Sequence, residues 1–249
     1  MINRTLLNRF HGVNLEELSA VQLQNRTDTK FIFKEDLLDS LLASLINDYL
    51  ILDEAGNRSF SYHTVYFDTA DFLLYKMHHN GKPNRFKVRI REYRETQMRF
   101  FEIKYRIKDD RTDKLRIAIN PGQDPFVLGL DKQILWGTAV PARLMPSLTT
   151  DFIRISLLSK RYGERITFDR NLRFSTNQKQ LELSGLVVAE VKQSKGFPMS
   201  PFLSLIKKLH LDQTGFSKYS MGIALCTEQK HNAFKPNLIR LQRILNPSA

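Results

Sequence analysis

Charged and apolar residues alternate without a break over residues 84–93, and such alternation is typical of a β-strand. Successive side chains of a strand point to opposite faces, so one face of this segment is basic and the other is apolar. The basic face carries Arg85, Lys87, Arg89 and Arg91, and the apolar face carries Phe86, Val88 and Ile90. Neighbouring charges on the basic face lie about 7 Å apart and repel one another. Either this face is solvated at an outer edge, or it faces a polyanion.

The same alternation recurs along the chain and predicts eight strands in all. A short polar link at residues 94–97 would join two of them as an antiparallel hairpin. The strands are expected over residues 26–33, 62–68, 84–93, 98–108, 113–119, 152–157, 165–172 and 186–192.

Helices are predicted where apolar residues recur at helical spacing and where capping residues precede them. Asn14 and Glu17 have the spacing of a capping box and would begin a helix at residues 14–23. An apolar stripe over residues 35–50 indicates a second, amphipathic helix. Further helices are expected from Thr69 to about residue 77, over residues 125–136, 201–211 and 218–227, and after Pro236.

The apolar stripes of these helices need an apolar surface to cover. If the apolar faces of the strands point outward under the helices, the charged faces line the inside of a closed sheet, and eight strands suit a barrel that holds one small ligand. The predicted fold class is therefore α+β, an eight-stranded antiparallel β-barrel with helices packed on the outside. Its interior would hold seven cations and two carboxylates, namely Lys30, Arg89, Arg91, Lys104, Arg106, Lys114, Lys192, Glu102 and Glu190. Such a channel is suited to phosphates and a divalent cation.

Composition supports a globular protein with an anionic partner. The chain has 249 residues, 42% of them hydrophobic, and no clear linker, so we expect one domain over residues 1–249 with a helical tail at 231–249. Its net charge of +12 favours a phosphate-rich partner. The single cysteine, Cys226, cannot form an internal disulfide, and no secretion signal or long apolar run is present, so a cytoplasmic location is expected.

Seven short motifs occur in an order and spacing that is specific as a set. They are Arg26-Thr27-Asp28-Thr29-Lys30, Tyr66-Phe67-Asp68-Thr69, Lys87-Val88-Arg89-Ile90-Arg91, Phe101-Glu102-Ile103-Lys104, Phe168-Asp169-Arg170-Asn171-Leu172, Ala189-Glu190-Val191-Lys192 and Phe216-Ser217-Lys218-Tyr219. Over about residues 26–226 the sequence resembles the VTC (vacuolar transporter chaperone) polyphosphate polymerase domain. That family belongs to the triphosphate tunnel metalloenzyme (CYTH-like) superfamily.

The resemblance implies an eight-stranded triphosphate tunnel that uses Mn²⁺ or Mg²⁺. In such enzymes the terminal phosphate of ATP or another nucleoside triphosphate passes to a polyphosphate chain. The resemblance implies catalytic roles for Lys30, Arg89, Arg91 and Lys104, substrate binding by Lys87, Arg106, Lys114, Arg154, Lys192 and Lys218, and metal binding by Glu190 and Glu102. Delivery of polymer across a membrane would need a membrane-protein partner in trans. The oligomeric state does not follow from the sequence.

Two other functions compete with this one. A hydrolase of the same fold would act on tripolyphosphate or nucleoside triphosphates, but that branch usually opens with two glutamates where this chain has Arg26 and Asp28. A noncatalytic module would bind polyphosphate or nucleic acid. Nucleic acid is disfavoured because the aromatic residues Phe86 and Phe101 lie on the face opposite the arginines.

Three acidic or basic positions have a simpler structural interpretation. Glu190 could form a salt bridge with a neighbouring cation, and only the family resemblance favours a metal ligand there. Asp169 and Arg170 are expected to be structural, near the end of a strand. The adjacent His78 and His79 point in different directions on a helix, and no role is assigned to them.

Overall fold

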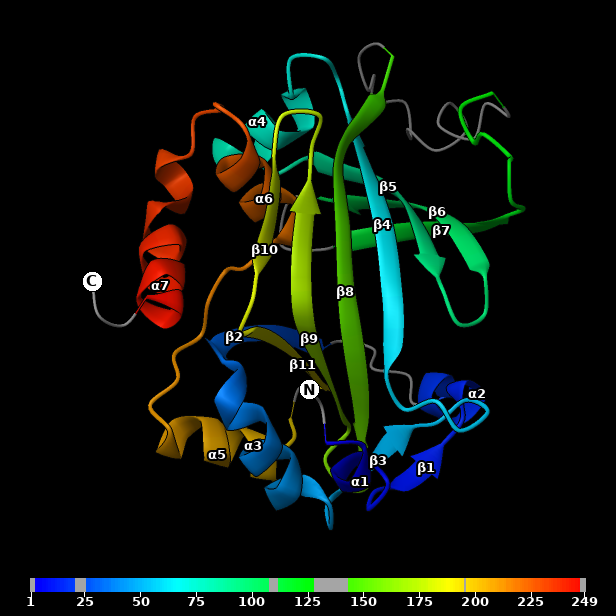
Figure 1. The fold of residues 1–249 in the computed structure, drawn as a ribbon, viewed down its shortest axis with the longest axis vertical. Coiled ribbons are helices and arrows are strands. Elements are labelled where there is room, and N and C mark those ends of the chain that lie inside the picture. Colours follow the sequence, from blue (N-terminus) through cyan, green and yellow to red (C-terminus); the bar gives the residue numbers. More distant parts are fainter. Residues whose placement is uncertain (1–2, 21–25, 108–111, 128–142, 195, 247–249) are drawn as a thin grey trace.

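All eight strands that the alternation predicts are present, and they form one antiparallel path (Figure 1). The computed structural model describes residues 3–20, 26–107, 112–127, 143–194 and 196–246. The path runs in the order β2, β11, β9, β8, β4, β5, β6, β7. These strands are β2 (Arg26–Lys34), β4 (Phe60–Asp68), β5 (Arg85–Tyr93), β6 (Met98–Arg106), β7 (Thr112–Ile119), β8 (Met145–Ser159), β9 (Glu164–Ser175) and β11 (Leu186–Ser194).

Three short strands extend this sheet, which has 11 strands in all. β1 (His11–Val13) pairs in parallel with β3 (Tyr49–Leu52), β3 pairs with β8, and β10 (Gln180–Leu183) pairs with β9. The helix predicted over residues 35–50 is wrong at its end. It consists of the 3-10 turn η1 (Glu35–Leu37) and α3 (Leu38–Leu45), and the chain then enters β3, because the apolar run from Tyr49 fills a buried strand beside β8.

The helices that begin at residues 15, 201 and 218 follow their capping signals, whereas the helix expected from Thr69 begins at Leu73. Asn14 and Glu17 form the predicted capping box, in which each side chain accepts the backbone N–H of the other at 2.9 and 2.8 Å, and α2 (Leu15–Ala20) begins there. Residues 21–23 of that predicted helix lie outside the described residues, as does the predicted helix at 125–136 beyond Val127. The other helical elements are α1 (Arg4–Leu7), α4 (Leu73–His79), α5 (Pro201–Lys208), α6 (Lys218–Cys226), η3 (Asn232–Phe234) and α7 (Lys235–Leu245). None of the described helices is long and apolar enough to cross a membrane.

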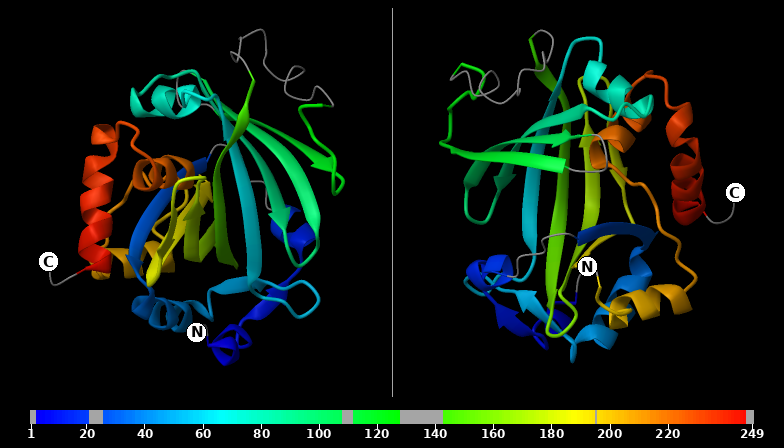
Figure 2. Two further views of the ribbon diagram at one scale, coloured as in Figure 1. Left: turned by 45° about the horizontal axis from the view of Figure 1, so that its top comes forward. Right: turned by 180° about the vertical axis from the view of Figure 1, so that it is seen from behind.

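The apolar faces of the strands point outward and the charged faces point inward, as predicted. Apolar residues of β2, β9 and β11 form one buried cluster with α3 and α5, and those of β5 and β6 form another with Leu74 of α4. The sheet curves strongly (Figure 2), so that Lys104 of β6 lies within electrostatic reach of Glu190 and Lys192 of β11. The terminal strands β2 and β7 are not paired with each other in the described part of the chain. Instead, the backbone N–H of Thr214 donates to the carbonyl of Lys30 at 2.8 Å on β2.

One carboxyl group is buried in the outer layer without a cation. Glu164 is fully buried, and its Oε1 accepts a hydrogen bond from the Tyr49 hydroxyl at 2.6 Å. Its Oε2 has no hydrogen-bond partner among the described residues. Burial therefore raises the pKa of Glu164, because the protein disfavours the charged form.

Replacing Glu164 with glutamine is expected to stabilise the protein at pH 8, where the buried carboxyl group would otherwise ionise. The folded pKa of Glu164 is raised, so its protonated form contributes full stability below the unfolded pKa and this contribution is lost as the pH rises through the folded pKa. The amide stays neutral throughout, so its advantage should grow with pH. Melting temperatures of both proteins at pH 5 and pH 8 test this. An equal loss of stability in the variant at both pH values would contradict it.

Candidate active site

The curved sheet encloses a cavity of about 420 Å³, lined by all eight strands of the path and by the beginning of α6. Among the described residues, twelve lysines and arginines line it but only four carboxylates do. They are Arg26, Lys30, Lys87, Arg89, Arg91, Lys104, Lys114, Arg116, Arg154, Arg165, Lys192 and Lys218, with Glu54, Glu102, Asp169 and Glu190. An anionic ligand would offset this excess of positive charge inside the protein.

The structure brings together all but one of the residues proposed from the sequence. Arg106 is the exception, because it pairs in register with Arg85 beyond the end of the cavity lining. From there its charge contributes to lowering the pKa of Lys87 and of His78. The sequence interpretation missed Asp169, which was expected to be only structural near a strand end. The alternation along β9 places the Asp169 side chain on the inward face, but the sequence does not show which residues it contacts.

Glu102 is enclosed by cations at the centre of β6. It is 1% exposed, and its carboxylate contacts Arg89 and Lys114 at 2.6 Å each and Arg116 at 3.6 Å. Burial raises the pKa of Glu102, but the nearby Arg89, Arg91 and Lys114 outweigh burial and hold it well below its usual range. Glu102 therefore organises the cations of β5 and β7. It is a poor candidate for the metal ligand proposed from the sequence.

Asp169 holds a second group of cations. Arg154 donates to its two oxygens through Nε and Nη2 at 2.5 and 2.7 Å, and Lys218 of α6 also bonds to it. Burial opposes ionisation, but Arg154 and Lys218 lower the pKa of Asp169 to about 2. The carboxylate thus fixes two cavity cations that come from distant parts of the sequence.

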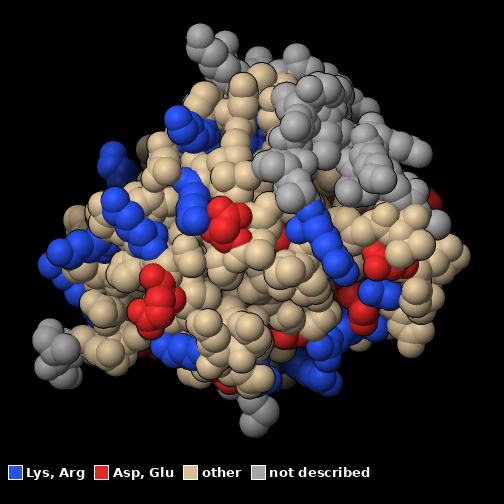
Figure 3. All heavy atoms as spheres, turned by 90° about the horizontal axis from the view of Figure 1, so that it is seen from above, with Lys and Arg blue, Asp and Glu red and all other residues tan. Residues whose placement is uncertain are grey.

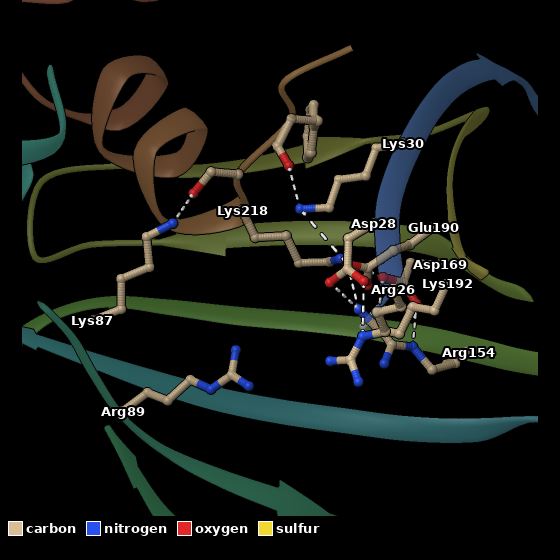
Figure 4. Close-up of polar contacts among 12 residues, drawn as sticks. Arg26, Asp28, Lys30, Lys87, Arg89, Arg154, Asp169, Glu190, Lys192 and Lys218 are labelled. Carbon is tan, nitrogen blue, oxygen red and sulfur yellow. Dashed lines mark hydrogen bonds and ion pairs between the residues drawn. The ribbon is translucent and has the colours of Figure 1, made fainter. Parts of the chain in front are cut away.

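Glu190 is held by cations at longer distances than Glu102 and Asp169 are, and Figure 4 shows it beside Lys30 and Lys192. Its Oε1 lies 3.0 Å from Nζ of Lys192 and 3.9 Å from Nζ of Lys30, while Lys192 also contacts Asp28 at 2.6 Å. Burial raises its pKa, but Lys30 and Lys192 bring it well below the usual range. In register beside Glu190 stands Thr167, which is 6% exposed and whose hydroxyl has no hydrogen-bond partner among the described residues.

Two lysines converge on the N-terminal end of α6 (Figure 4). Nζ of Lys87 donates to the hydroxyl of Ser217 at 3.0 Å, and Nζ of Lys30 donates to the carbonyl of Phe216 at 3.1 Å. Burial, followed by repulsion from Lys30 and other cations, lowers the pKa of Lys87 to about 7. Burial, followed by repulsion from Arg89, lowers the pKa of Lys104. Lysines with depressed pKa values gain a proton when an anion binds beside them.

Binding of tripolyphosphate is expected to take up nearly one proton through Lys87 at pH 8. Free Lys87 is largely neutral above its pKa of about 7 and would become charged beside phosphate, whereas at pH 6 it already carries its proton. Calorimetry in buffers of different ionisation enthalpy measures this uptake. The Lys87→Met variant should lose most of it at pH 8. Uptake that is the same at pH 6 and pH 8, or unchanged in the variant, would contradict the assignment.

Asp68 fixes α6 where it borders the cavity. Its carboxylate accepts the backbone N–H groups of Leu74 and Tyr75 in α4 at 2.8 and 2.9 Å, and also the hydroxyl of Tyr219 in α6. The two helices are therefore joined at one buried carboxylate, which positions the neighbouring Lys218.

The outer surface carries its charge differently from the cavity. On the face in Figure 3, the described lysines and arginines lie in separate groups, with acidic and other residues between them. On this face the positive charge is not concentrated as it is in the cavity lining.

The antiparallel sheet is curved, with helices on its outside and cations lining its inside. A family model of the VTC domain matches residues 25–133 and 138–227. The chain belongs to the VTC domain family. A comparison with curated proteins finds no match.

Solved structures show distant likeness. A candidate adenylate cyclase from Vibrio parahaemolyticus has a TM-score of 0.48 at 12% identity, covering 81% of this chain and 99% of that one. A candidate adenylyl cyclase from Hippeastrum with a dominant triphosphatase activity has a TM-score of 0.47 at 14% identity, covering 79% and 94%. The PH1819 protein from Pyrococcus horikoshii has a TM-score of 0.44 at 11% identity, covering 80% and 99%.

Proposed function

We propose that this protein is a phosphotransferase that moves the terminal phosphate of a nucleoside triphosphate to a polyphosphate chain inside the basic cavity. The observation that carries the proposal is the excess of lysine and arginine over carboxylates in a cavity of about 420 Å³. A triphosphate supplies several negative charges in a narrow chain of oxygens, which matches cations arranged on several walls. Membership of the VTC domain family supports the same substrate class.

The cations can do most of what phosphoryl transfer requires. This reaction needs an aligned donor and acceptor and neutralised oxygens more than a covalent intermediate on the protein. Arg89 and Arg91 share the inner face of β5 with Lys87, and arginine forks can each hold two phosphate oxygens. Lys30 and Lys218 approach from β2 and α6 and would hold the phosphates at the α6 end.

A divalent cation fits this cavity through Glu190. Among the described residues, no three His, Cys, Asp or Glu side chains are placed so that together they could hold a metal ion. These residues alone therefore do not supply a complete set of metal ligands. Mg²⁺ usually binds through one or two carboxylates together with phosphate oxygens and water. Glu190 meets this requirement once Lys192 turns to its second partner, Asp28. The ion, Mn²⁺ or Mg²⁺, would neutralise charge on the transferring phosphate.

The alternative function is hydrolysis of the same triphosphates, with water in place of the polymer as acceptor. Incubation with ATP and Mn²⁺, with products separated by size, distinguishes the functions. A ladder of polyphosphate is the expected result. Release of free phosphate alone would show a hydrolase, and no turnover would leave a noncatalytic binding module.

The proposed function also bears on transport of the product across a membrane. A product made in this cavity would need a membrane-protein partner in trans in order to cross a membrane. Polyphosphate produced in a soluble assay would show that the chain itself needs no such partner for synthesis.

A further inference from the structure

The two ends of the cavity differ in chemistry. Along the inner face of β5 the side chains change from Lys87, Arg89 and Arg91 near α6 to Tyr93 at the β5–β6 hairpin. Along β6 they change from Lys104 to Met98, which pairs in register with Tyr93. The cavity therefore becomes richer in apolar and aromatic groups where it reaches the hairpin, although Glu54, Arg116 and Arg154 also line this end.

Segments from three further elements complete this second end. The hairpin end is lined by aliphatic and aromatic side chains, namely Leu15 and Leu18 of α2, Leu52 of β3, and Phe60 and Tyr62 of β4. The ring of Tyr93 lies 4.8 Å from that of Tyr62. At the rim, Leu15 and Met98 are 44% and 39% exposed.

This end is held in a fixed shape. Glu54 accepts the backbone N–H of Leu15 at 2.5 Å, and the capping box at Asn14 fixes the start of the same helix. Beside the hairpin, Arg116 of β7 donates to the hydroxyl of Tyr93 at 3.0 Å and stacks over the ring of Phe100 at 3.6 Å. The Tyr93 ring is thus oriented before a ligand arrives, which limits the entropy lost on binding.

Phosphate has few favourable contacts to make with such a surface, because Arg154 is held by both oxygens of Asp169 and Arg116 by Glu102 and Tyr93. Polyphosphate offers charged oxygens along its whole length, and these lose hydration beside aliphatic and aromatic groups without replacement hydrogen bonds. A nucleobase has a flat apolar face that stacks well on a tyrosine ring. The apolar end is continuous with the basic part of the same cavity, so one nucleotide can occupy both.

We propose that the α2 and hairpin end of the cavity binds the base of the donor nucleotide, which stacks on Tyr93 between Leu15 and Met98. This inference rests on the proposed function. It also assigns a direction to the donor: the base lies at the α2 end, and the terminal phosphate points towards Lys30, Lys87 and Lys218 at the α6 end. The acceptor polyphosphate must then meet the donor from the α6 side.

Calorimetric binding of ATP and of tripolyphosphate, both without metal, tests the inference. Tyr93→Ala and Met98→Ser should each weaken ATP binding, by about tenfold for Tyr93→Ala, while tripolyphosphate affinity changes less than about twofold. Tyr93→Phe keeps the ring and should retain ATP affinity. Leu209→Ser changes another exposed apolar residue, 40% exposed and outside the cavity lining, and should alter neither ligand.

The outcomes separate this inference from the proposed function. If Tyr93→Ala and Met98→Ser lost affinity for ATP and tripolyphosphate equally, or if both kept the wild-type ATP affinity, the base site would be overturned while the proposed function stands. A wild-type protein that binds neither ligand would overturn the proposed function itself. Melting curves establish that each variant is folded, and Met98→Ser, at an exposed position, keeps the test decisive if Tyr93→Ala does not fold.

Discussion

Replacing Asp169 with asparagine is expected to lower the free energy of unfolding by about 3–5 kcal/mol, the cost of leaving buried charges without their partner. In the wild-type protein the carboxylate neutralises Arg154 and Lys218, both of which are largely buried. The asparagine side chain keeps the shape but removes the charge. Because the pKa of Asp169 is lowered to about 2 from its usual 3.8, its contribution is present at neutral pH and is lost progressively as the pH falls below 3.8 and through about 2.

Chemical denaturation at pH 7 measures this loss. A matched control is Asp151→Asn, since Asp151 contacts His63 and Arg94 at 2.8 and 3.0 Å but is 32% exposed, and such a pair contributes about 0–1 kcal/mol. Tripolyphosphate should stabilise the Asp169→Asn variant more than the wild type, because phosphate can replace the missing carboxylate. Equal stabilities of the Asp169→Asn and Asp151→Asn variants would show that Asp169 does not organise this site.

Replacing Glu190 with glutamine is expected to reduce Mn²⁺-dependent turnover by more than about 100-fold, since the proposed cation loses its charged protein ligand. Triphosphate binding in chelator should be at least as tight as in the wild type, because one negative charge leaves a basic cavity. Stability should change by only about 1 kcal/mol. The reason is that Lys192 keeps Asp28 as partner and Lys30 keeps the carbonyl of Phe216.

Turnover, affinity in chelator and melting temperature can be measured on one preparation. Glu182→Gln is a suitable control. Glu182 of β10 forms an exposed ion pair with Arg173 of β9, and both residues lie outside the cavity lining. A Glu190→Gln variant that stays active with Mn²⁺ would remove Glu190 from the metal site. A variant that loses its fold would show that the salt bridge to Lys192 is its main role.

The strands of the path were predictable because charged and apolar residues alternate within each segment. This alternation can be recognised without knowing which strands lie beside it. The apolar run at Tyr49 has no such period, since β3 is buried, and it was joined to the preceding helix. β10, with only four residues, gave too short a pattern. The inward direction of the basic faces was also predictable, because the apolar stripes of helices such as α3 had to cover something.

The roles of individual carboxylates were not predictable from the sequence alone. Parity places Glu102 and Glu190 on inward faces, but only the strand register shows that Glu102 lies between Arg89 and Arg116. Asp169 meets Lys218, a residue 49 positions away, through the placement of α6 against β9. The alternation along β6 also predicted that Arg106 lines the cavity. In the structure Arg106 pairs with Arg85 where the two strands extend past the cavity, and the sequence does not show where the cavity ends.

The charge imbalance of the cavity also governs how quickly a substrate arrives. A hollow with positive walls focuses its field outward through the mouths, so an approaching polyanion is drawn in over roughly a Debye length, about 8 Å at physiological ionic strength. Added salt shortens that reach and slows encounter, but it screens the buried contacts at Arg91 and Lys104 far less. The association rate of a polyanion thus depends on the salt concentration, while the residence time of a bound chain depends on its contacts with the cavity side chains.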